Sequence, residues 1–336
     1  MEEIFIMDMK AFCEKVKAAL TEHTEEGMQV RISEVRKNNG IVLHGVSVFR
    51  PGINITPTVY LEQFLERYED GETFADIMRQ IETVLDENRL DESFDVSIFT
   101  DFKKARERIV YKLVNVQRNG EILEDVPYMP YLDMAVVFYY LLDEQQTDGY
   151  ATILIRNTHM KYWGITTEEL YEIAASNTVK LLPPKICNME DMMRQILAGG
   201  ISELQSKKNP WDPEWPEKLS IDELISQVIG EDQQVPMYVL TNRSHYYGAA
   251  GILYPELLKC IGERLESNFF VLPSSVHELI LLRDLGVEDA ATLMDMVKEV
   301  NRTEVKAEEV LSDSVYYYDR EKETLCILRR EAYAVQ

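Results

Sequence analysis

Residues 134–142, MAVVFYYLL, form the longest strongly apolar stretch of this 336-residue sequence. A helix that crosses a membrane needs roughly 20 apolar residues, so this run is too short to span a bilayer. Polar turn residues follow it at 143–149, and a second apolar run follows at 150–155. The two runs together predict a buried antiparallel hairpin.

The sequence before this stretch predicts a second hairpin with helices around it. Two apolar-rich runs flank Asn38, Asn39 and Gly40, and an Asn-Gly pair tolerates the positive φ of a tight turn. Thr73 and Asp76 resemble a capping box at the start of a helix. Apolar residues at helical spacing predict helices at 8–23, 59–68 and 73–88, and a further strand is expected at 109–116.

The sequence after the stretch presents one order of elements twice, as strand, strand, helix, strand and proline. In the first passage a helix opens at Thr166, with Glu169 as its capping partner, and the strand after it stops at Pro183. The second passage repeats the order with different residues, so duplication and coincidental similarity are both open explanations. The strands of the two passages are expected at 134–142, 150–155 and 179–182, and at 237–240, 249–253 and 269–272. A helix at 255–265, a strand at 276–282, a helix at 288–300 and a closing hairpin at 315–328 are also expected.

These elements predict an α+β protein with mainly antiparallel sheets and packed helices. An N-terminal α+β module with acidic helices is expected at 1–105, and a C-terminal α+β domain at 106–336. The C-terminal domain carries a proline- and tryptophan-rich insertion at about 199–235, which includes Trp211 and Trp215. Exposed tryptophans on such a loop would contact a partner, whereas folded-back ones would anchor the loop.

The net charge of −24 bounds the partners of this protein. A negative field repels nucleic-acid phosphates and anionic lipids, so we expect neither direct nucleic-acid binding nor membrane binding. The start of the sequence lacks the features of an export signal, which favours the cytoplasm. Residues 59–101 contain thirteen Asp and Glu against three Arg, a net charge of −10. This segment is either a solvated helical surface or the docking site of a basic protein partner, with Glu62, Glu66, Glu69 and Asp70 as candidate contacts.

The sequence indicates no metal site and no cofactor. Its four cysteines lie far apart and form no C-x-x-C pair, so they provide neither a zinc ribbon nor a dithiol redox motif. His277 and Glu278 resemble the start of a zinc-protease helix, but Leu281 stands where the second histidine is required. The glycine-rich strings of dinucleotide and phosphate sites and the hydrolase nucleophile elbow are also absent.

Ser274, Ser275 and His277 are the candidates for a catalytic site. A serine nucleophile needs a base within hydrogen-bonding distance, and this histidine follows the two serines directly after a buried strand. A turn in which the serine hydroxyls bond backbone amides explains the same residues and is the favoured interpretation.

Three further residues are candidates for binding a ligand. His159 and Trp163 follow a predicted strand, where an imidazole beside an aromatic ring could hold a ligand or pack at the strand end. Asp133 opens the apolar stretch, so a buried carboxylate there would need hydrogen-bond partners.

The chain resembles a family of uncharacterised bacterial proteins, the domain-of-unknown-function family 5688. The strings that carry the resemblance, in order, are KNNGIVLHGVSV, SIFTDFKKARERIVYKLVN, DVPYMPYLDMAVVFYYLL, ATILIRNTHMKYWGIT, LPSSVHELILL and LSDSVYYYD. More distantly, WGITTEELYEIAASN and LPSSVHELILL are similar to the YtpQ-like proteins, in which Asn-Arg-Asp often follows the proline; here Ser274, Ser275 and Val276 follow it. Neither resemblance implies an activity or a catalytic residue.

We therefore expect a non-enzymatic protein-interaction or regulatory module. Two alternatives stay open. One is an acidic nucleic-acid mimic that occupies a basic DNA-binding surface through residues 59–101, and whose binding weakens steeply as salt rises. The other is a hydrolase that uses Ser274, Ser275 or His277.

Overall fold

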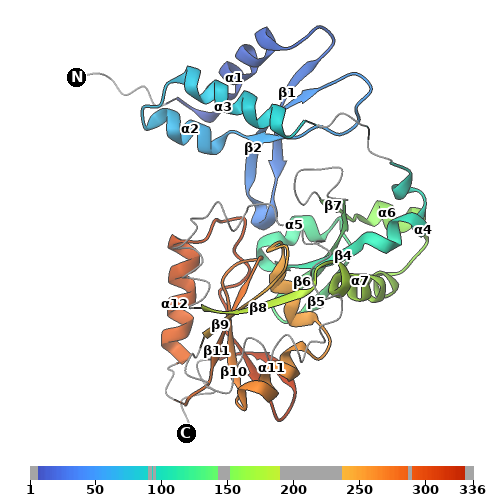
Figure 1. The fold of residues 1–336 in the computed structure, drawn as a ribbon, viewed down its shortest axis with the longest axis vertical. Helices are drawn as coiled ribbons and strands as arrows, with labels where there is room; N and C mark the ends of the chain where they lie inside the picture. The colour runs from blue at the N-terminus through green and yellow to red at the C-terminus, as the bar shows by residue number, and fades with distance from the viewer. Residues whose placement is uncertain are drawn as a thin grey trace, which may run out of the picture. The chain divides into compact units, whose positions relative to one another are not determined.

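A computed structural model of the chain describes residues 7–89, 93, 96–142, 152–189, 237–286 and 290–329 (Figure 1). The chain forms two compact units, the first from residues 1–101 with 142–151 and the second from residues 102–141 with 152–336. The α+β class is confirmed, and every strand pair within the described ranges is antiparallel.

The first unit contains a three-stranded sheet in the order β1-β2-β3 with helices before and after it. Its elements are α1 (Met9–His23), β1 (Gln29–Arg36), η1 (Asn38–Gly40), β2 (Val42–Phe49), β3 (Val59–Tyr60), α2 (Glu62–Glu69), α3 (Phe74–Glu87) and η2 (Val96–Phe99). The predicted Asn-Gly hairpin is confirmed, because Asn39 and Gly40 turn between β1 and β2 with φ of 61° and 70°. The helix expected from residue 59 begins only at Glu62, since residues 59 and 60 pair with β2.

The helices of the first unit cover one face of its sheet (Figure 1). Phe12 and Val16 of α1 and Ile77 and Ile81 of α3 are completely buried there, together with Val46 of β2. Burial of one such side chain stabilises a fold by roughly 1.5–3 kcal/mol, so this cluster holds the helices on the sheet.

The second unit contains two sheets, a four-stranded one and a six-stranded one. The order of the larger sheet is β13-β12-β10-β11-β9-β8, and in the smaller sheet β6 pairs with β4, β5 and β7. Between residues 102 and 189, the elements of the second unit are α4 (Phe102–Ala105), η3 (Arg106–Arg108), β4 (Ile109–Asn115), η4 (Gln117–Asn119), α5 (Gly120–Leu123), β5 (Tyr128–Tyr131), β6 (Met134–Leu141), β7 (Thr152–Leu154), α6 (Asn157–Trp163), α7 (Thr167–Leu181) and β8 (Pro184–Asn188). From residue 237 onward, the elements are β9 (Met237–Asn242), η6 (Gly248–Leu253), α11 (Leu257–Leu265), β10 (Phe269–Pro273), β11 (Leu279–Arg283), α12 (Ala290–Thr303), β12 (Tyr316–Asp319) and β13 (Thr324–Ile327).

One hydrophobic core joins the two sheets of the second unit. Successive side chains of a strand point to opposite faces of the sheet, so every second residue of a strand enters this core. Phe269 and Val271 of β10 point into this core, where Tyr111 and Phe138 of the smaller sheet also lie. Phe270, on the opposite face of β10, packs toward α12 in a separate cluster. The apolar stretch quoted first is therefore the central strand β6, and the hairpin predicted with it is confirmed by the β6–β7 pairing.

The strand expected at 179–182 is wrong. These residues end α7, because the helix opened by the capping box of Thr166 and Glu169 continues to Leu181. The strand follows one step later as β8, which begins at Pro184. A proline is tolerated there because β8 lies at the edge of its sheet.

The strand expected at 249–253 is also wrong, since this segment forms the 3-10 helix η6. The segment begins Gly248-Ala249-Ala250-Gly251, which lacks the branched and aromatic side chains that favour strands. The second of the two similar passages therefore has no second strand. Within the described ranges, no helix combines the length and the apolar character needed to cross a bilayer.

Asp133 couples the two sheets of the second unit through its carboxylate. It lies in the turn between β5 and β6 and accepts three hydrogen bonds from the segment that leads into β12. The donors are Ser312 Oγ at 2.7 Å, Ser314 Oγ at 2.9 Å and Tyr316 OH at 2.7 Å. A carboxylate with three hydroxyl donors is well satisfied, so Asp133 links the two sheets.

Replacement of Asp133 by alanine should lower the free energy of unfolding by about 2–4 kcal/mol, because three hydroxyl groups lose their acceptor. Urea unfolding followed by circular dichroism measures this change. Asp125→Ala is the control, since it removes an exposed ion pair with Arg156 that is worth less than about 1 kcal/mol. An equally small loss in both variants would contradict the role of Asp133.

Candidate functional site

The catalytic candidates lie where two loops of the second unit meet. The turn between β10 and β11 contains Ser274, Ser275 and His277, and the loop between β9 and η6 contains Tyr247. The backbone amide of Tyr247 donates to Nδ1 of His277 at 3.1 Å, and the two rings stack with centroids 5.5 Å apart. The hydroxyl of Thr241 donates to the His277 carbonyl at 2.8 Å, which adds a second bond between the two segments.

The loop after β9 is held in a strained conformation. His245 and Tyr247 both have positive φ, 54° and 57°, which side chains other than glycine adopt rarely. The buried side chain of Asn242 stabilises the loop, because its Oδ1 accepts from Ser244 Oγ at 2.7 Å and its Nδ2 donates to the Tyr246 carbonyl at 2.8 Å. The loop therefore presents its aromatic side chains in one fixed arrangement.

Gly248 ends this loop at a point of close approach. A β-carbon there would contact the Thr241 hydroxyl and would lie 2.6 Å from both the Asn242 amide nitrogen and the His277 carbonyl oxygen. Only glycine allows the loop and the β10–β11 turn to approach so closely.

The hydrogen bond from Tyr247 fixes the protonation of His277. A ring nitrogen that accepts a hydrogen bond carries no proton, so the neutral imidazole holds its proton on Nε2. Burial, together with the ammonium groups of Lys112 and Lys306, lowers the pKa of His277 to about 4. The imidazole is therefore neutral at pH 7, and its Nδ1 accepts the hydrogen bond that joins the two loops.

The two serines make different contacts. Ser275 Oγ accepts from the His277 amide at 3.0 Å, which is the serine turn favoured by the sequence. Ser274 Oγ donates to Oε1 of Glu278 at 3.4 Å, and burial raises the pKa of Glu278, an effect that this hydrogen bond partly offsets. Within the described ranges, neither serine hydroxyl is hydrogen-bonded to the imidazole of His277, so the pairing that nucleophilic catalysis requires is not formed.

Tyrosines around His277 were not among the residues that the sequence singled out. Tyr246 OH donates to Tyr247 OH at 3.0 Å, and the Lys112 ammonium lies 4.2 Å from the centroid of the Tyr247 ring. The ring of Tyr139 in β6 meets Tyr247 at 5.3 Å in an edge-on arrangement. Burial raises the pKa of Tyr246 and of Tyr247, so both phenols stay protonated at neutral pH.

A second histidine is held neutral in the same region. Lys185 Nζ donates to Nε2 of His245 at 2.9 Å, and burial with this ammonium lowers the pKa of His245 to about 4. Within the described ranges no group of three histidine, cysteine or carboxylate side chains is arranged to hold a metal ion.

The ligand candidates His159 and Trp163 both lie in α6 and contact each other. Their rings stack with centroids 5.7 Å apart, and the Trp163 ring also meets Phe102 at 5.4 Å. His159 Nδ1 accepts from the Arg156 amide at 3.0 Å and thereby caps the helix. Burial and the charge of Arg156 lower the pKa of His159.

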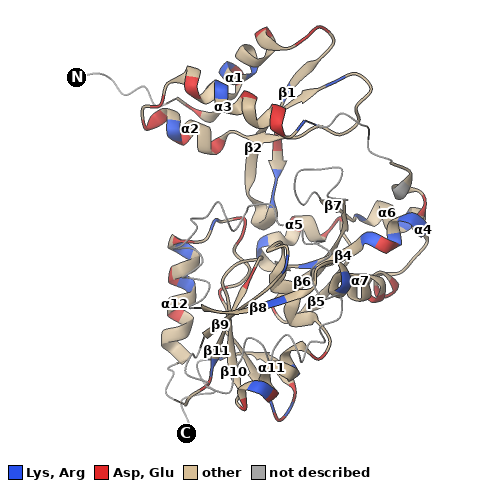
Figure 2. Cartoon of the chain, viewed as in Figure 1, with Lys and Arg blue, Asp and Glu red and all other residues tan. Residues whose placement is uncertain are grey.

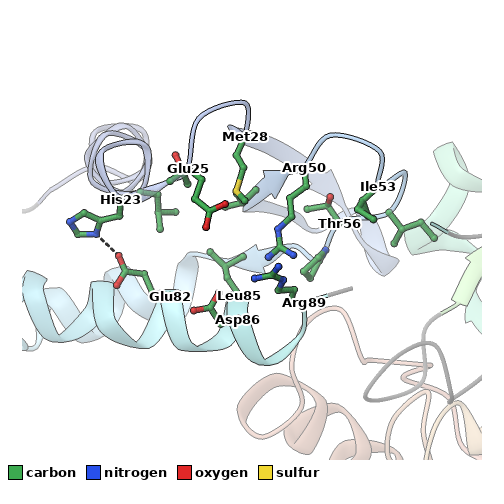
Figure 3. A pocket seen from close by; sticks show the side chains of 15 residues that line it. His23, Glu25, Met28, Arg50, Ile53, Thr56, Glu82, Leu85, Asp86 and Arg89 are labelled. Atoms are coloured by element: carbon green, nitrogen blue, oxygen red, sulfur yellow. Dashed lines mark hydrogen bonds and ion pairs between the residues drawn. The ribbon is translucent and has the colours of Figure 1, made fainter. Parts of the chain in front are cut away.

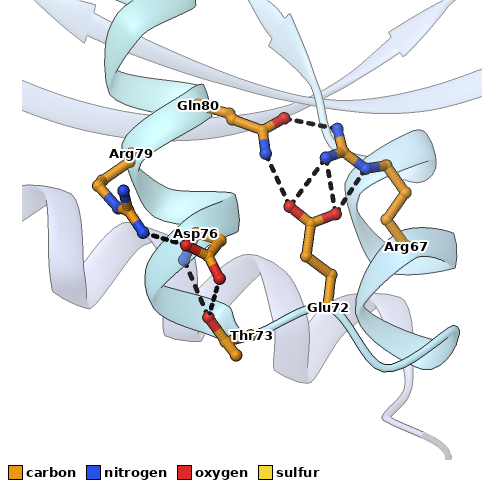
Figure 4. Close-up of polar contacts among 6 residues, drawn as sticks. All are labelled: Arg67, Glu72, Thr73, Asp76, Arg79 and Gln80. Carbon is orange, nitrogen blue, oxygen red and sulfur yellow. Dashed lines mark hydrogen bonds and ion pairs between the residues drawn. The ribbon is translucent and has the colours of Figure 1, made fainter.

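The six acidic residues at 62–76 of the first unit fall into two groups. Figure 2 shows acidic residues along α2 and α3 with basic residues between them. In the first group the carboxylates bond neighbours: Glu72 binds Arg67 and Gln80, and Asp76 binds Arg79 (Figure 4). Glu62 also belongs here, since its Oε1 accepts from the His44 amide at 2.6 Å.

The second group is exposed. Glu66 and Glu69 lie on the last turns of α2, and Asp70 caps the end of the helix. Among the described residues, no side chain forms a hydrogen bond or an ion pair with their carboxylates. We call these three residues the α2 acidic surface. Trp211 and Trp215, with the insertion at about 199–235, lie outside the described residues.

Comparison with known proteins yields one match. The model of a family of unknown function, DUF5688, matches residues 9–320, which is most of the chain. No curated protein and no solved structure matches this chain.

Stability should fall as the pH decreases from about 6.5 to about 4, and His277 should account for part of this loss. A histidine with a folded pKa near 4 and an unfolded pKa near 6.5 binds more protons in the unfolded state over this range, so acid favours unfolding. His277→Asn keeps an acceptor for the Tyr247 amide and removes the titration, so the variant should lose on the order of 2 kcal/mol less than wild type.

Urea unfolding at several pH values measures this difference. Glu278 and Glu309 have raised pKa values and act in the opposite direction, but they are common to both proteins. Parallel curves for wild type and variant would contradict the assignment.

Gly248→Ala should destabilise the second unit by about 2–4 kcal/mol, because the added methyl group meets backbone atoms that cannot move independently. Gly251→Ala is the matched control in the same 3-10 helix, since its β-carbon would meet only the Leu240 side chain at 3.4 Å. Thermal unfolding compares the two, and equal stability of both variants would show that the close approach at Gly248 is not required.

Proposed function

The chain belongs to the family of unknown function DUF5688, and we propose that the protein is a cytoplasmic, non-enzymatic interaction or regulatory module. We propose further that it binds a basic protein partner through the α2 acidic surface. The observation that carries this proposal concerns the acidic residues at 62–76, of which three form hydrogen bonds or ion pairs within the unit and three are exposed.

The spacing of the three exposed carboxylates supports a docking role. Glu66, Glu69 and Asp70 stand at positions i, i+3 and i+4, so they lie on one side of the helix end. Like charges at this spacing repel and destabilise a helix by a few tenths of a kcal/mol, and a basic partner relieves that repulsion. Glu72 and Asp76 have arginine partners in the fold and offer less to a partner protein.

The hydrolase alternative has less support. His277 uses Nδ1 to accept from the Tyr247 amide, and its pKa of about 4 makes it a weak base. Ser275 caps the turn, and Ser274 bonds Glu278 rather than a histidine. The polar groups of this turn are arranged to join two loops.

A nucleic-acid mimic is the second candidate function, and the hydrogen bond that Glu62 accepts from the His44 amide counts against it. A mimic presents an extended row of free carboxylates, whereas Glu62, Glu72 and Asp76 are bonded within the unit. Three clustered carboxylates suit a compact basic site on a protein better than an extended nucleic-acid-binding surface.

Replacement of the α2 acidic surface by E66Q, E69Q and D70N should weaken partner binding roughly tenfold, because exposed charges supply the attraction and specificity of such contacts. The measurement is quantitative affinity purification of full-length protein from its own host, compared with the triple variant E172Q, E263Q and E304Q. This control removes the same charge from exposed positions in the second unit.

A partner lost with the first variant and retained with the control supports the proposal. Partners retained equally by both variants would contradict it. Titration with salt separates the two candidates, since a mimic loses its partner much more steeply than a compact contact with three charges.

A further inference from the structure

The first unit contains a cavity of about 310 Å³ that lies apart from the α2 acidic surface (Figure 3). Its walls come from the end of α1 with the loop that follows, the end of β2 with the loop that follows, and the second half of α3 with Arg89 after it. None of the three residues of the α2 acidic surface lines it. The volume is at the lower end of the range for ligand sites, which suits a small metabolite rather than a dinucleotide.

Two arginines enter this cavity from different elements. Arg50 follows β2 and Arg89 follows α3, and Figure 3 shows their guanidinium groups reaching toward the same space. A guanidinium presents a planar fork of donors that matches a carboxylate, and its positive charge attracts one. The two arginines therefore make this end of the cavity favourable for an anionic group.

Carboxylates line the rest of the polar wall. Glu82 is occupied, because its Oε1 lies 2.7 Å from His23 Nδ1 and this hydrogen bond raises the pKa of His23. Glu25 and Asp86 line the cavity without a side-chain partner among the described residues. They repel a ligand with several negative charges and attract an ammonium group.

The floor between these polar groups is apolar. Leu20 and Leu85 line the cavity and are only 3% and 8% exposed to solvent. The thioether of Met28 also reaches into the cavity. A flexible methionine beside two leucines accommodates branched or unbranched hydrocarbon groups.

We propose that this cavity binds a small apolar α-amino acid. The ligand's carboxylate faces Arg50 and Arg89, its ammonium faces Glu25 and Asp86, and its side chain packs on the apolar floor. The proposal is independent of the partner proposed above, since the two surfaces share no residue.

Isothermal titration of the full-length chain with L-leucine, L-valine, L-methionine and L-phenylalanine tests this site. At least one of them should bind saturably. The same titration with L-leucinamide, which lacks the carboxylate, with isocaproate, which lacks the ammonium, and with inorganic phosphate should show binding at least tenfold weaker. Saturable binding of none of the four amino acids, or equal binding of any of the three analogues, would overturn the proposal.

Variants locate the site. Arg89→Gln and Asp86→Asn should each weaken amino-acid binding at least tenfold, whereas Arg79→Gln and Glu87→Gln, which lie in α3 but outside the cavity, should leave it unchanged. Circular dichroism shows whether each variant is folded. If a variant is unfolded, the titrations of the unmutated protein with the ligand analogues still test the proposal. Equal loss in the variants and their controls would contradict the location. The triple variant of the α2 acidic surface should retain amino-acid binding, which separates this site from the proposed docking surface.

Discussion

The backbone amide of Tyr247 donates a hydrogen bond to Nδ1 of His277, and the arrangement of the second unit around this bond determines what its polar groups can do. The bond forms only because the loop after β9 holds Tyr247 at positive φ and because Gly248 lets the turn after β10 approach. It joins two loops of the second unit, and Tyr247 and Val276 of these loops pack in the core shared by the two sheets. The same bond makes His277 a neutral acceptor, so a residue that the sequence offered as a catalytic base acts as a structural link.

Local signals in the sequence predicted much of the fold, and long-range contacts account for what they missed. The Asn-Gly turn and the capping box at Thr166 depend on residues a few positions apart, and both are confirmed. The expectation of a strand at 179–182 is wrong because α7 continues to Leu181, and Pro184 begins the strand rather than ending it, since an edge strand accepts a proline. Within η6 the small residues fit closely beneath their neighbours, a constraint set by Leu240 and Thr241 rather than by local propensity.

The residues of the candidate site depend even more on long-range contacts, which local sequence signals do not reveal. His277 could be singled out because it follows two serines, but its partner Tyr247 stands thirty residues earlier and belongs to a loop without a known motif. Asp133 was recognised as needing partners, and these lie about 180 residues later in the chain. The pair Tyr246-Tyr247 before a glycine is the signal that the sequence offers, because two adjacent aromatic residues in a loop bury large rings only if both find contacts.

The structural role of His277 depends on its neutral, acceptor state, and nitrogen-15 NMR of the histidine rings measures that state directly. The chain has five histidines, so the spectrum is small enough to assign with the variant His277→Asn. His277 should carry its proton on Nε2 at pH 7, and its pKa should be about 4. A proton on Nδ1, or a titration near the ordinary value of about 6.5, would show that the imidazole is free to act as a base and would contradict this structural role.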